Sequence, residues 1–437
     1  MALPFPVTVF MKKREDFMNT NVKNAAKLVP MSLCFSVGAV LFSSHAGGGF
    51  ASGNQAYQNF VVNGWLAPIS AIIAMLVLTI TIREAMFLYN SRGLKSYKEL
   101  FNCLYSPFDR IGAKNGKAAF RPEWLFEIFF YIMVLMAVAA AISTAASTLQ
   151  QKIGLNYYTG IVLVGCVILL LTIFGVPLVR RASTVMGIAI LATSVTIFAI
   201  GIFLAPDLKS AISTSFAADG FSKLPKAVMT GFVYAGFQCV VIPTMIVCGA
   251  PLTTRKACKN SMWISFGLNA VALTLSVFML LGWAPVYTAV EGGVTIPTLT
   301  ALNQMGMPWL SAVYSICLIL CLISTGVTTV FGFTARFEKA KALSGIKSST
   351  LRSAIVSALI MIAAMCVSTV GLSRIIKYGY GYCGYLAVAI IIIPFLTVGV
   401  YKNRRYVAEH PEYAGVPAKE IRRREEEKNV AAAGGAM

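Results

Sequence analysis

The residues best suited to chemistry in this chain lie in one stretch, Ser43 to Asn54. It reads S-S-H-A-G-G-G-F-A-S-G-N and brings together hydroxyl groups, an imidazole and three consecutive glycines. The stretch falls inside a long apolar run from Leu28 to about Asn63. A single helix of that length would reach roughly 50 Å, whereas about 20 helical residues span a bilayer core. The run must therefore be interrupted.

The triplet Gly47-Gly48-Gly49 is the predicted point of interruption. Each glycine costs roughly 1 kcal/mol relative to alanine inside a helix, so three in a row favour unwinding. Unwound backbone in the middle of a membrane is tolerated only where it is buried in protein or lines a cavity. We therefore expect this stretch to form the floor of a binding site, with Ser44 and His45 beside the glycines.

A second interruption is predicted in the apolar run from Pro225 to Gly249. Its centre reads Y-A-G-F-Q-C, which places Gly236 and Gln238 at mid-depth, and Pro243 follows closely. Proline removes a helical hydrogen bond, and polar residues at this depth need partners, so the pattern predicts a second broken helix.

Aromatic residues flank both predicted breaks. Phe50 and Tyr57 follow the first, and Tyr234 and Phe237 lie at the second. Aromatic rings at such positions line apolar pockets or stack on cationic amines. The alternative for each ring is ordinary packing between helices.

The ends of broken helices carry partial charges that select a ligand. The outer half of the first run begins near Gly49, so its N–H groups suit a carboxylate or another anion. The carbonyl groups at which the inner half ends suit an ammonium group or a metal cation. A zwitterion such as an amino acid matches both ends.

Two further features suggest a coupling ion. Ser324-Thr325 and Thr328-Thr329 lie one helical turn apart, and hydroxyls near free carbonyls provide oxygen ligands for a small hard cation such as Na⁺. The alternative is that each hydroxyl bonds to the carbonyl of the preceding turn. His45 is the only ionisable side chain predicted at mid-depth, and it can carry a proton or only form hydrogen bonds.

The composition identifies the elements that must position these residues. Of 437 residues, 57% are hydrophobic and only 12% are charged, against about a quarter charged in soluble domains. Long continuous apolar runs predict an all-α polytopic membrane protein and not a β-barrel, whose strands alternate. The net charge of +20 is explained by basic cytoplasmic loops, so we expect a lipid bilayer and no nucleic acid as partner.

Ten apolar segments are predicted as transmembrane helices, with both termini cytoplasmic. All but six of the 37 Lys and Arg residues then fall on the cytoplasmic side, as the positive-inside rule requires. A short helix, Thr298 to Gln304, is predicted in an outer loop that covers the site. The segments are 28–63, 65–89, 123–151, 157–179, 184–205, 225–249, 262–284, 308–333, 353–372 and 379–401.

The two predicted breaks are five segments apart. The first five segments start inside and end outside, whereas the second five run the other way, which gives a five-plus-five inverted repeat. Interrupted segments at matching positions of two halves indicate a transporter binding site. We divide the chain into a cytoplasmic N-terminal segment, a first repeat, an extracellular loop, a second repeat and a mobile cytoplasmic tail: 1–27, 28–206, 207–224, 225–401 and 402–437.

The stretch G-G-G-F-A-S-G, Gly47 to Gly53, followed by N-Q-A-Y-Q-N-F, resembles the G-A-G-F-A-S-G-Q-E stretch of YkvI-like bacterial membrane proteins. These belong to the amino acid–polyamine–organocation (APC) superfamily, whose members have the LeuT-type fold. The resemblance implies that backbone amides near the glycines hold a substrate carboxylate. The predicted substrate-binding residues are Ser44, His45, Gly47, Gly48, Gly49, Phe50, Tyr234, Gly236, Phe237 and Gln238.

The same resemblance implies a sodium site. In sodium-coupled members a Ser/Thr pair on the eighth helix joins carbonyls of the first helix around Na⁺, which corresponds here to Ser324, Thr325 and the carbonyl of Ala46, with Thr328 as a further candidate. In some proton-coupled members a Lys on the fifth helix replaces the ion, and segment 184–205 has no Lys. Na⁺ is therefore the first choice of coupling ion and a proton on His45 the second.

One departure from the group concerns the residues after the glycines. This chain has Asn-Gln, residues 54 and 55, where the group has Gln-Glu, so any role of that carboxylate is absent or moved. A multi-histidine metal site is also not expected, because the chain has only two His residues.

Together these patterns predict a cation-coupled symporter of a small zwitterionic or amine solute, an amino acid or a derivative, in a bacterial plasma membrane. The alternative is a ligand-sensing receptor subunit of the same fold, similar to germinant receptors, which binds an amino acid without transporting it. An enzyme is not expected, because no segment offers a nucleophile–base pair or a metal cluster. The sequence leaves the substrate, the direction of transport and the oligomeric state open.

Overall fold

The computed structural model describes residues 29–45, 48–106, 123–174, 176–288, 294–337, 346 and 348–415, and within these ranges the chain is helical, without a strand. Eight of its helices are long and apolar enough to cross a membrane. A ninth span results if the pair Ile188–Phe203 and Leu208–Asp219, bent by 76°, counts as one. The prediction of an all-helical polytopic membrane protein is confirmed.

The long helices follow the predicted apolar segments closely, because a chain in lipid must satisfy its backbone hydrogen bonds internally. The last span is the most irregular, since three π-helical stretches interrupt it. The spans after the first are α5 (Ala67–Ser91), α7 (Glu123–Ile153), α8 (Tyr157–Phe174), α9 (Val176–Phe203), α11 (Leu224–Gln238) with η2 (Cys239–Val241) and α12 (Ile242–Cys248), α13 (Arg255–Gly282), α16 (Pro308–Phe337), α17 (Ser349–Ser368), and the composite of α18 (Leu372–Arg374), η4 (Ile375–Tyr380), α19 (Gly381–Ala387), η5 (Val388–Ile392), η6 (Phe395–Gly399) and α20 (Val400–Glu409).

The first span is broken, as predicted. The described part of helix α2 (Met31–His45) and helix α3 (Gly48–Ala51) are separated by residues 46 and 47, which lie outside the described residues. The outer half is not the single helix we expected, because Gly53 turns the chain with a φ of +78° before α4 (Asn54–Asn59) and η1 (Val61–Leu66). The outer half therefore consists of three short helical pieces.

The second interruption is milder than predicted. Helix α11 passes through the 3₁₀ turn η2 into α12, and the flanking residues Cys239 and Val241 keep right-handed helical dihedral angles. Pro243 lies in the first turn of α12, where its missing N–H is tolerated. The sixth span therefore remains helical, with a short change of helix type.

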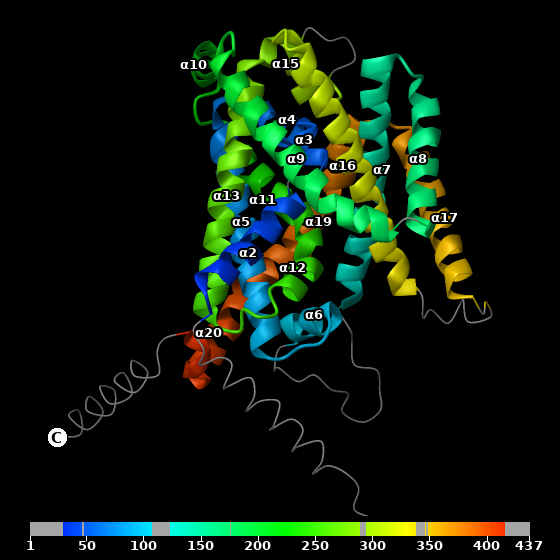
Figure 1. Ribbon diagram of the computed structural model, residues 1–437. Helices are drawn as coiled ribbons and strands as arrows, with labels where there is room; N and C mark the ends of the chain where they lie inside the picture. Colours follow the sequence, from blue (N-terminus) through cyan, green and yellow to red (C-terminus); the bar gives the residue numbers. More distant parts are fainter. Residues whose placement is uncertain are drawn as a thin grey trace, which may run out of the picture.

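Two groups of helices form the body of the molecule (Figure 1). Helices α2, α5, α11 and α13 pack against one another in one group, and α7, α8, α16 and α17 form the other. Helix α9 contacts both groups through α13 and α16, and the last span does so through α11 and α7.

The packing repeats when the spans are numbered in chain order and shifted by five. The first span packs on α13, and its equivalent α11 packs on α5. In the other group α7 packs on α17, and its equivalent α16 packs on α8. The fifth span, α9, packs on the eighth, α16, and in the same way the last span packs on the third, α7. Successive spans cross the bundle in alternating directions, so two spans that are five apart run in opposite directions. The five-plus-five inverted repeat requires this arrangement.

Both ends of the described chain lie on the same, basic side of the bundle. Near the start of α2, Cys34 Sγ lies 3.7 Å from the Ala257 carbonyl oxygen at the start of α13. At the other end, η7 (Pro411–Ala414) also packs on α13. The N-terminal segment and residues 416–437 lie outside the described residues, so their predicted cytoplasmic position stays a prediction.

The predicted tail begins as ordered structure. The last helix continues past residue 401 to Glu409, because Lys402 is buried and donates from Nζ to the Cys103 carbonyl at 2.6 Å. Arg92 stacks over the Tyr406 ring at 4.5 Å. Residues 402–415 therefore belong to the packed body, in contrast to the mobile tail we expected from residue 402 onward.

Short helices cover the ends of the bundle. On the basic side, α6 (Tyr97–Tyr105) begins at Ser96, whose hydroxyl accepts a hydrogen bond from the Glu99 amide. On the opposite side the predicted outer loop 207–224 contains α10 (Leu208–Asp219), and α14 (Ala284–Thr288) precedes α15 (Pro297–Gln304). Helix α15 matches the short helix predicted in the outer loop.

Candidate functional site

A cavity of about 750 Å³ lies at the interruption of the first span. Ser44 and His45, at the end of α2, line the cavity together with Gly49 and Phe50 of α3. From there the lining follows the halves of α7, α9 and α16 that lie toward the basic side, and it ends at Arg336. The cavity therefore connects the middle of the bundle with the side predicted to be cytoplasmic.

Several predicted site residues come together in the wall of this cavity. Two groups far apart in sequence meet there, the first break and the hydroxyl pairs of α16, and Gln238 of the sixth span also lines the cavity. The predicted residues that line the cavity are Ser44, His45, Gly49, Phe50, Gln238, Ser324, Thr325 and Thr328.

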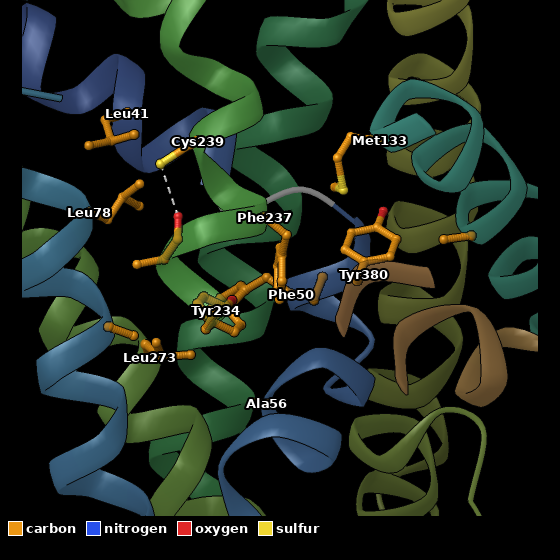
Figure 2. Packing of buried hydrophobic residues seen from close by; sticks show 14 of the residues in the cluster. Leu41, Phe50, Ala56, Leu78, Met133, Tyr234, Phe237, Cys239, Leu273 and Tyr380 are labelled. Carbon is orange, nitrogen blue, oxygen red and sulfur yellow. Dashed lines mark hydrogen bonds between the residues drawn. The ribbon is translucent and has the colours of Figure 1, made fainter. Parts of the chain in front are cut away.

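Three predicted residues of the sixth span lie behind the wall. Tyr234 and Phe237 are fully buried, and the Phe237 ring packs between Tyr234 and Tyr380 at centroid distances of 4.7 and 5.1 Å (Figure 2). A side chain at Gly236 would overlap the carbonyl of Gly384, so this glycine allows α11 and α19 to approach closely. Their role in the structure is to shape the wall.

The remaining predicted residues belong to the first break itself. Gly48 is the first residue of α3, whereas Ala46 and Gly47 lie outside the described residues. Helix α3 has four residues, so few peptide dipoles are aligned at its start, and the partial positive charge expected there is weaker than that of a long helix.

His45 is held by two side chains from distant helices. Its Nδ1 lies 2.8 Å from Asn269 Oδ1 on α13, and its Nε2 lies 2.8 Å from Tyr234 Oη on α11. Asn269 donates from Nδ2 to the Ser265 carbonyl at 2.8 Å, so its Oδ1 is the acceptor for a proton on His45 Nδ1.

This arrangement leaves the Nε2 atom of His45 to respond to protonation. In the neutral ring Nε2 accepts a hydrogen bond from the Tyr234 hydroxyl. In the charged ring Nε2 donates to that hydroxyl, which then turns to Gln55 Oε1, 3.4 Å away. The network joins α2, α4, α11 and α13 around one imidazole.

Four residues of the site were not predicted from the sequence. Gln55 and Tyr380 line the cavity, Asn269 fixes the His45 ring, and Arg336 forms the basic end. A polar Asn inside an apolar run is a signal for a functional site in principle. Arg336 gave no such signal. It follows the predicted segment 308–333, so it was interpreted as one of the basic residues that mark the cytoplasmic side.

The outer side of the first break is closed by contacts with the second half. Asn54 donates from Nδ2 to the Thr295 carbonyl at 2.8 Å and to Ser373 Oγ at 3.1 Å. The amide of Thr298 donates to the Ser52 carbonyl at 3.3 Å, and Tyr314 donates to the Ala51 carbonyl. These bonds tie the outer half of the first span to α15, α16 and the last span.

The hydroxyls of α16 differ in their partners. Thr328 donates to the carbonyls of Ser324 and Thr325, at 2.9 and 3.2 Å, so its proton is used within its own helix. Ser324 is buried at the cavity wall, and α16 packs against α3 next to the break. Among the described residues no group of three or more His, Cys, Asp or Glu could hold a metal ion.

No model of a protein family and no curated protein matches the chain, so the resemblance to YkvI-like proteins stays a prediction. Among solved structures, the chain is similar to a manganese transporter of Eremococcus coleocola, with a TM-score of 0.49 and 13% identity over 93% of this chain and 90% of that one. It is similar to a Na⁺-coupled sialic acid symporter, with a TM-score of 0.48 and 13% identity over 85% and 88% of the two chains. It is also similar to MhsT in complex with L-phenylalanine, with a TM-score of 0.48 and 10% identity over 83% and 98%.

Proposed function

We propose that the protein is a cation-coupled secondary transporter that carries a small zwitterionic or amine solute, an amino acid or a derivative, across a bacterial plasma membrane. The observation that supports this most is the sidedness of the cavity. It begins at the broken first span and ends at Arg336 on the basic side, while the opposite side is closed by hydrogen bonds between the two halves.

This sidedness is what one state of an alternating-access cycle requires. A transporter must close one route to its central site before it opens the other, and the two halves must separate where they now touch. The outer contacts include hydrogen bonds, such as that of Asn54 with the Thr295 carbonyl, which can break and form again during the cycle. A backbone interrupted at mid-depth gives the solute peptide groups to bind.

We propose Na⁺ as the first candidate for the coupled ion. Ser324 and Thr325 line the cavity next to the interruption of the first span, and hydroxyl and carbonyl oxygens are the ligands that Na⁺ prefers. A proton is the second candidate, carried by His45 through its hydrogen bond with Tyr234. Both ions are cargo of the transport cycle.

The experiment that tests this proposal is uptake into proteoliposomes, with a Na⁺ gradient and a pH gradient imposed separately. We expect accumulation of an amino acid driven by the Na⁺ gradient and lost in Ser324→Ala and Thr325→Ala. Loss of pH-driven uptake in His45→Ala would instead assign the proton. Binding of an amino acid without accumulation under either gradient would contradict transport and favour the ligand-sensing alternative.

A further inference from the structure

The basic end of the cavity carries a cation that is fixed in place. Arg336 lies near the end of α16, with its guanidinium carbon 3.6 Å from the centre of the Phe130 ring and 4.5 Å from that of Tyr97. The two rings come from α7 and α6, and aromatic faces of this kind hold the plane of a guanidinium group. Arg336 is therefore positioned at the mouth of the cavity.

Glu127, an acidic residue that contacts this cluster through Tyr97, has other partners. Glu127 accepts from Lys98 Nζ at 2.7 Å and from the Tyr97 hydroxyl at 2.9 Å. Burial raises the pKa of Tyr97, so its hydroxyl stays neutral at physiological pH. Among the residues that the structure describes, Arg336 forms no ion pair.

Arg336 lines the cavity at this end. Nη1 of Arg336 is buried and has no hydrogen-bond partner in the described ranges. A buried donor without an acceptor is costly, and for a charged group the cost is larger. The positive charge that Arg336 brings to the cavity lining favours an anionic solute, and a carboxylate fits arginine best because it can accept two of its donors at once.

The rest of the cavity adds no negative charge. None of the described residues that line it is an Asp or a Glu. Apart from Arg336, the polar side chains of the lining carry hydroxyls, amides and one imidazole. A cationic amine would find no counter-ion among these residues, whereas an anionic group would find one in Arg336.

We infer that the transported solute carries a carboxylate, which Arg336 binds at the cytoplasmic end of the cavity, and that amines without an acidic group are excluded. This inference rests on the proposed function and narrows its substrate class. Arg336 and the aromatic rings of Phe130 and Tyr97 then form a second contact for the solute, separate from the interrupted backbone of the first span.

A paired ligand panel tests the inference on the intact protein. Thermal stabilisation is measured with L-leucine, L-phenylalanine and L-lysine and with their decarboxylation products isoamylamine, phenethylamine and cadaverine, each pair differing only in the carboxylate. We expect stabilisation by acids and not by the amines. In Arg336→Gln the Kd of a binding acid should rise tenfold or more, and in Arg336→Lys less. Amines that bind as tightly as the acids would overturn the inference.

A second measurement does not depend on the identity of the solute. Gly332 also lines the cavity, one turn before Arg336, and an added Cβ there meets nothing within 4 Å. In Gly332→Cys the reaction rates with an anionic and a cationic methanethiosulfonate reagent are compared, and protein without the added cysteine gives the background of the ten native ones. We expect the anionic-to-cationic ratio to fall at least fivefold when Arg336→Gln is added. Any change in thiol ionisation affects both reagents equally and cancels in the ratio.

The two measurements separate the inference from the function it rests on. If the ratio falls but no amino acid binds or accumulates, the anion preference stands and the proposed transport fails. If an amino acid accumulates but the ratio stays within twofold and Arg336→Gln binds normally, transport stands and the inference is wrong.

Discussion

The first and sixth spans occupy equivalent positions in the two halves, yet they are interrupted to different degrees. In the first, the described part of α2 ends at His45, and from Gly48 the chain forms three short helical pieces with a turn at Gly53. In the sixth, α11 continues through a 3₁₀ turn into α12. At its interruption the first span has three consecutive glycines, whereas the sixth has only Gly236, a difference of roughly 2 kcal/mol in helix propensity.

The glycines at the two positions also do different things. Gly236 lets α11 and α19 touch, since any side chain there would overlap the Gly384 carbonyl. Gly49 lines the cavity, and the amide of Gln55 fills the space where its side chain would be. From this comparison we propose that Gly236 serves packing and Gly49 serves binding. Substitutions at one should change stability, and substitutions at the other should change transport.

Gly236→Ala should have the largest effect. The atoms that its new methyl group would meet belong to the backbone of Gly384 and cannot turn aside, so α11 and α19 must separate, which costs about 3 kcal/mol as overpacking does. Thermal unfolding in detergent measures this. The matched control is Gly267→Ala on α13, where the added Cβ meets nothing within 4 Å. Equal stability of the two variants would contradict a packing role for Gly236.

Asn269→Leu tests the polar network that holds the end of α2. The change removes the acceptor for His45 Nδ1 and leaves a buried donor unpaired, so we expect the free energy of unfolding to fall by about 2 kcal/mol. Ser276→Ala on the same helix is the control, because the hydroxyl of Ser276 is buried with no partner among the described residues. A loss as large in the control would mean that the effect is not specific to His45.

Gly49→Ala should change solute binding and leave stability nearly unaltered. The added methyl group displaces the flexible amide of Gln55 from its place at the cavity wall. We expect solute affinity or initial uptake to fall about tenfold, which is about 1.4 kcal/mol. Gln55→Ala alone should show a similar loss, and Gly49→Ala together with Gln55→Ala should add little to it. A fall in stability as large as that of Gly236→Ala would erase the distinction between the two spans.

The sequence predicted the spans well because each is a continuous apolar run punctuated by basic residues. It predicted the first interruption because three glycines act locally. It overestimated the second, since one glycine and Pro243 at the start of a new helical segment are compatible with a continuous span. A local pattern cannot distinguish these cases without the packing partner, Gly384.

The site could be predicted in part for the same reason. Residues adjacent to the first break, such as His45 and Phe50, lie at the cavity because the break itself creates it. Asn269 and Arg336 join the site only through the way α13 and α16 pack, which no local pattern encodes. The positive-inside rule also explains a basic residue at this position, so no pattern in the sequence was a reason to place Arg336 at the cavity.

Thr328→Ala should have the smallest effect, and it sharpens the assignment of binding to the first break. Of the hydroxyls on α16, that of Thr328 donates to two carbonyls of its own helix, so its loss should change the Na⁺ concentration for half-maximal uptake by less than twofold. Ser324→Ala, at the buried wall beside α3, should raise that concentration by fivefold or more. Uptake measured over a Na⁺ series at fixed solute separates the two. If Thr328→Ala proves the more damaging change, the ion lies farther toward the cytoplasmic end of α16 than the first break.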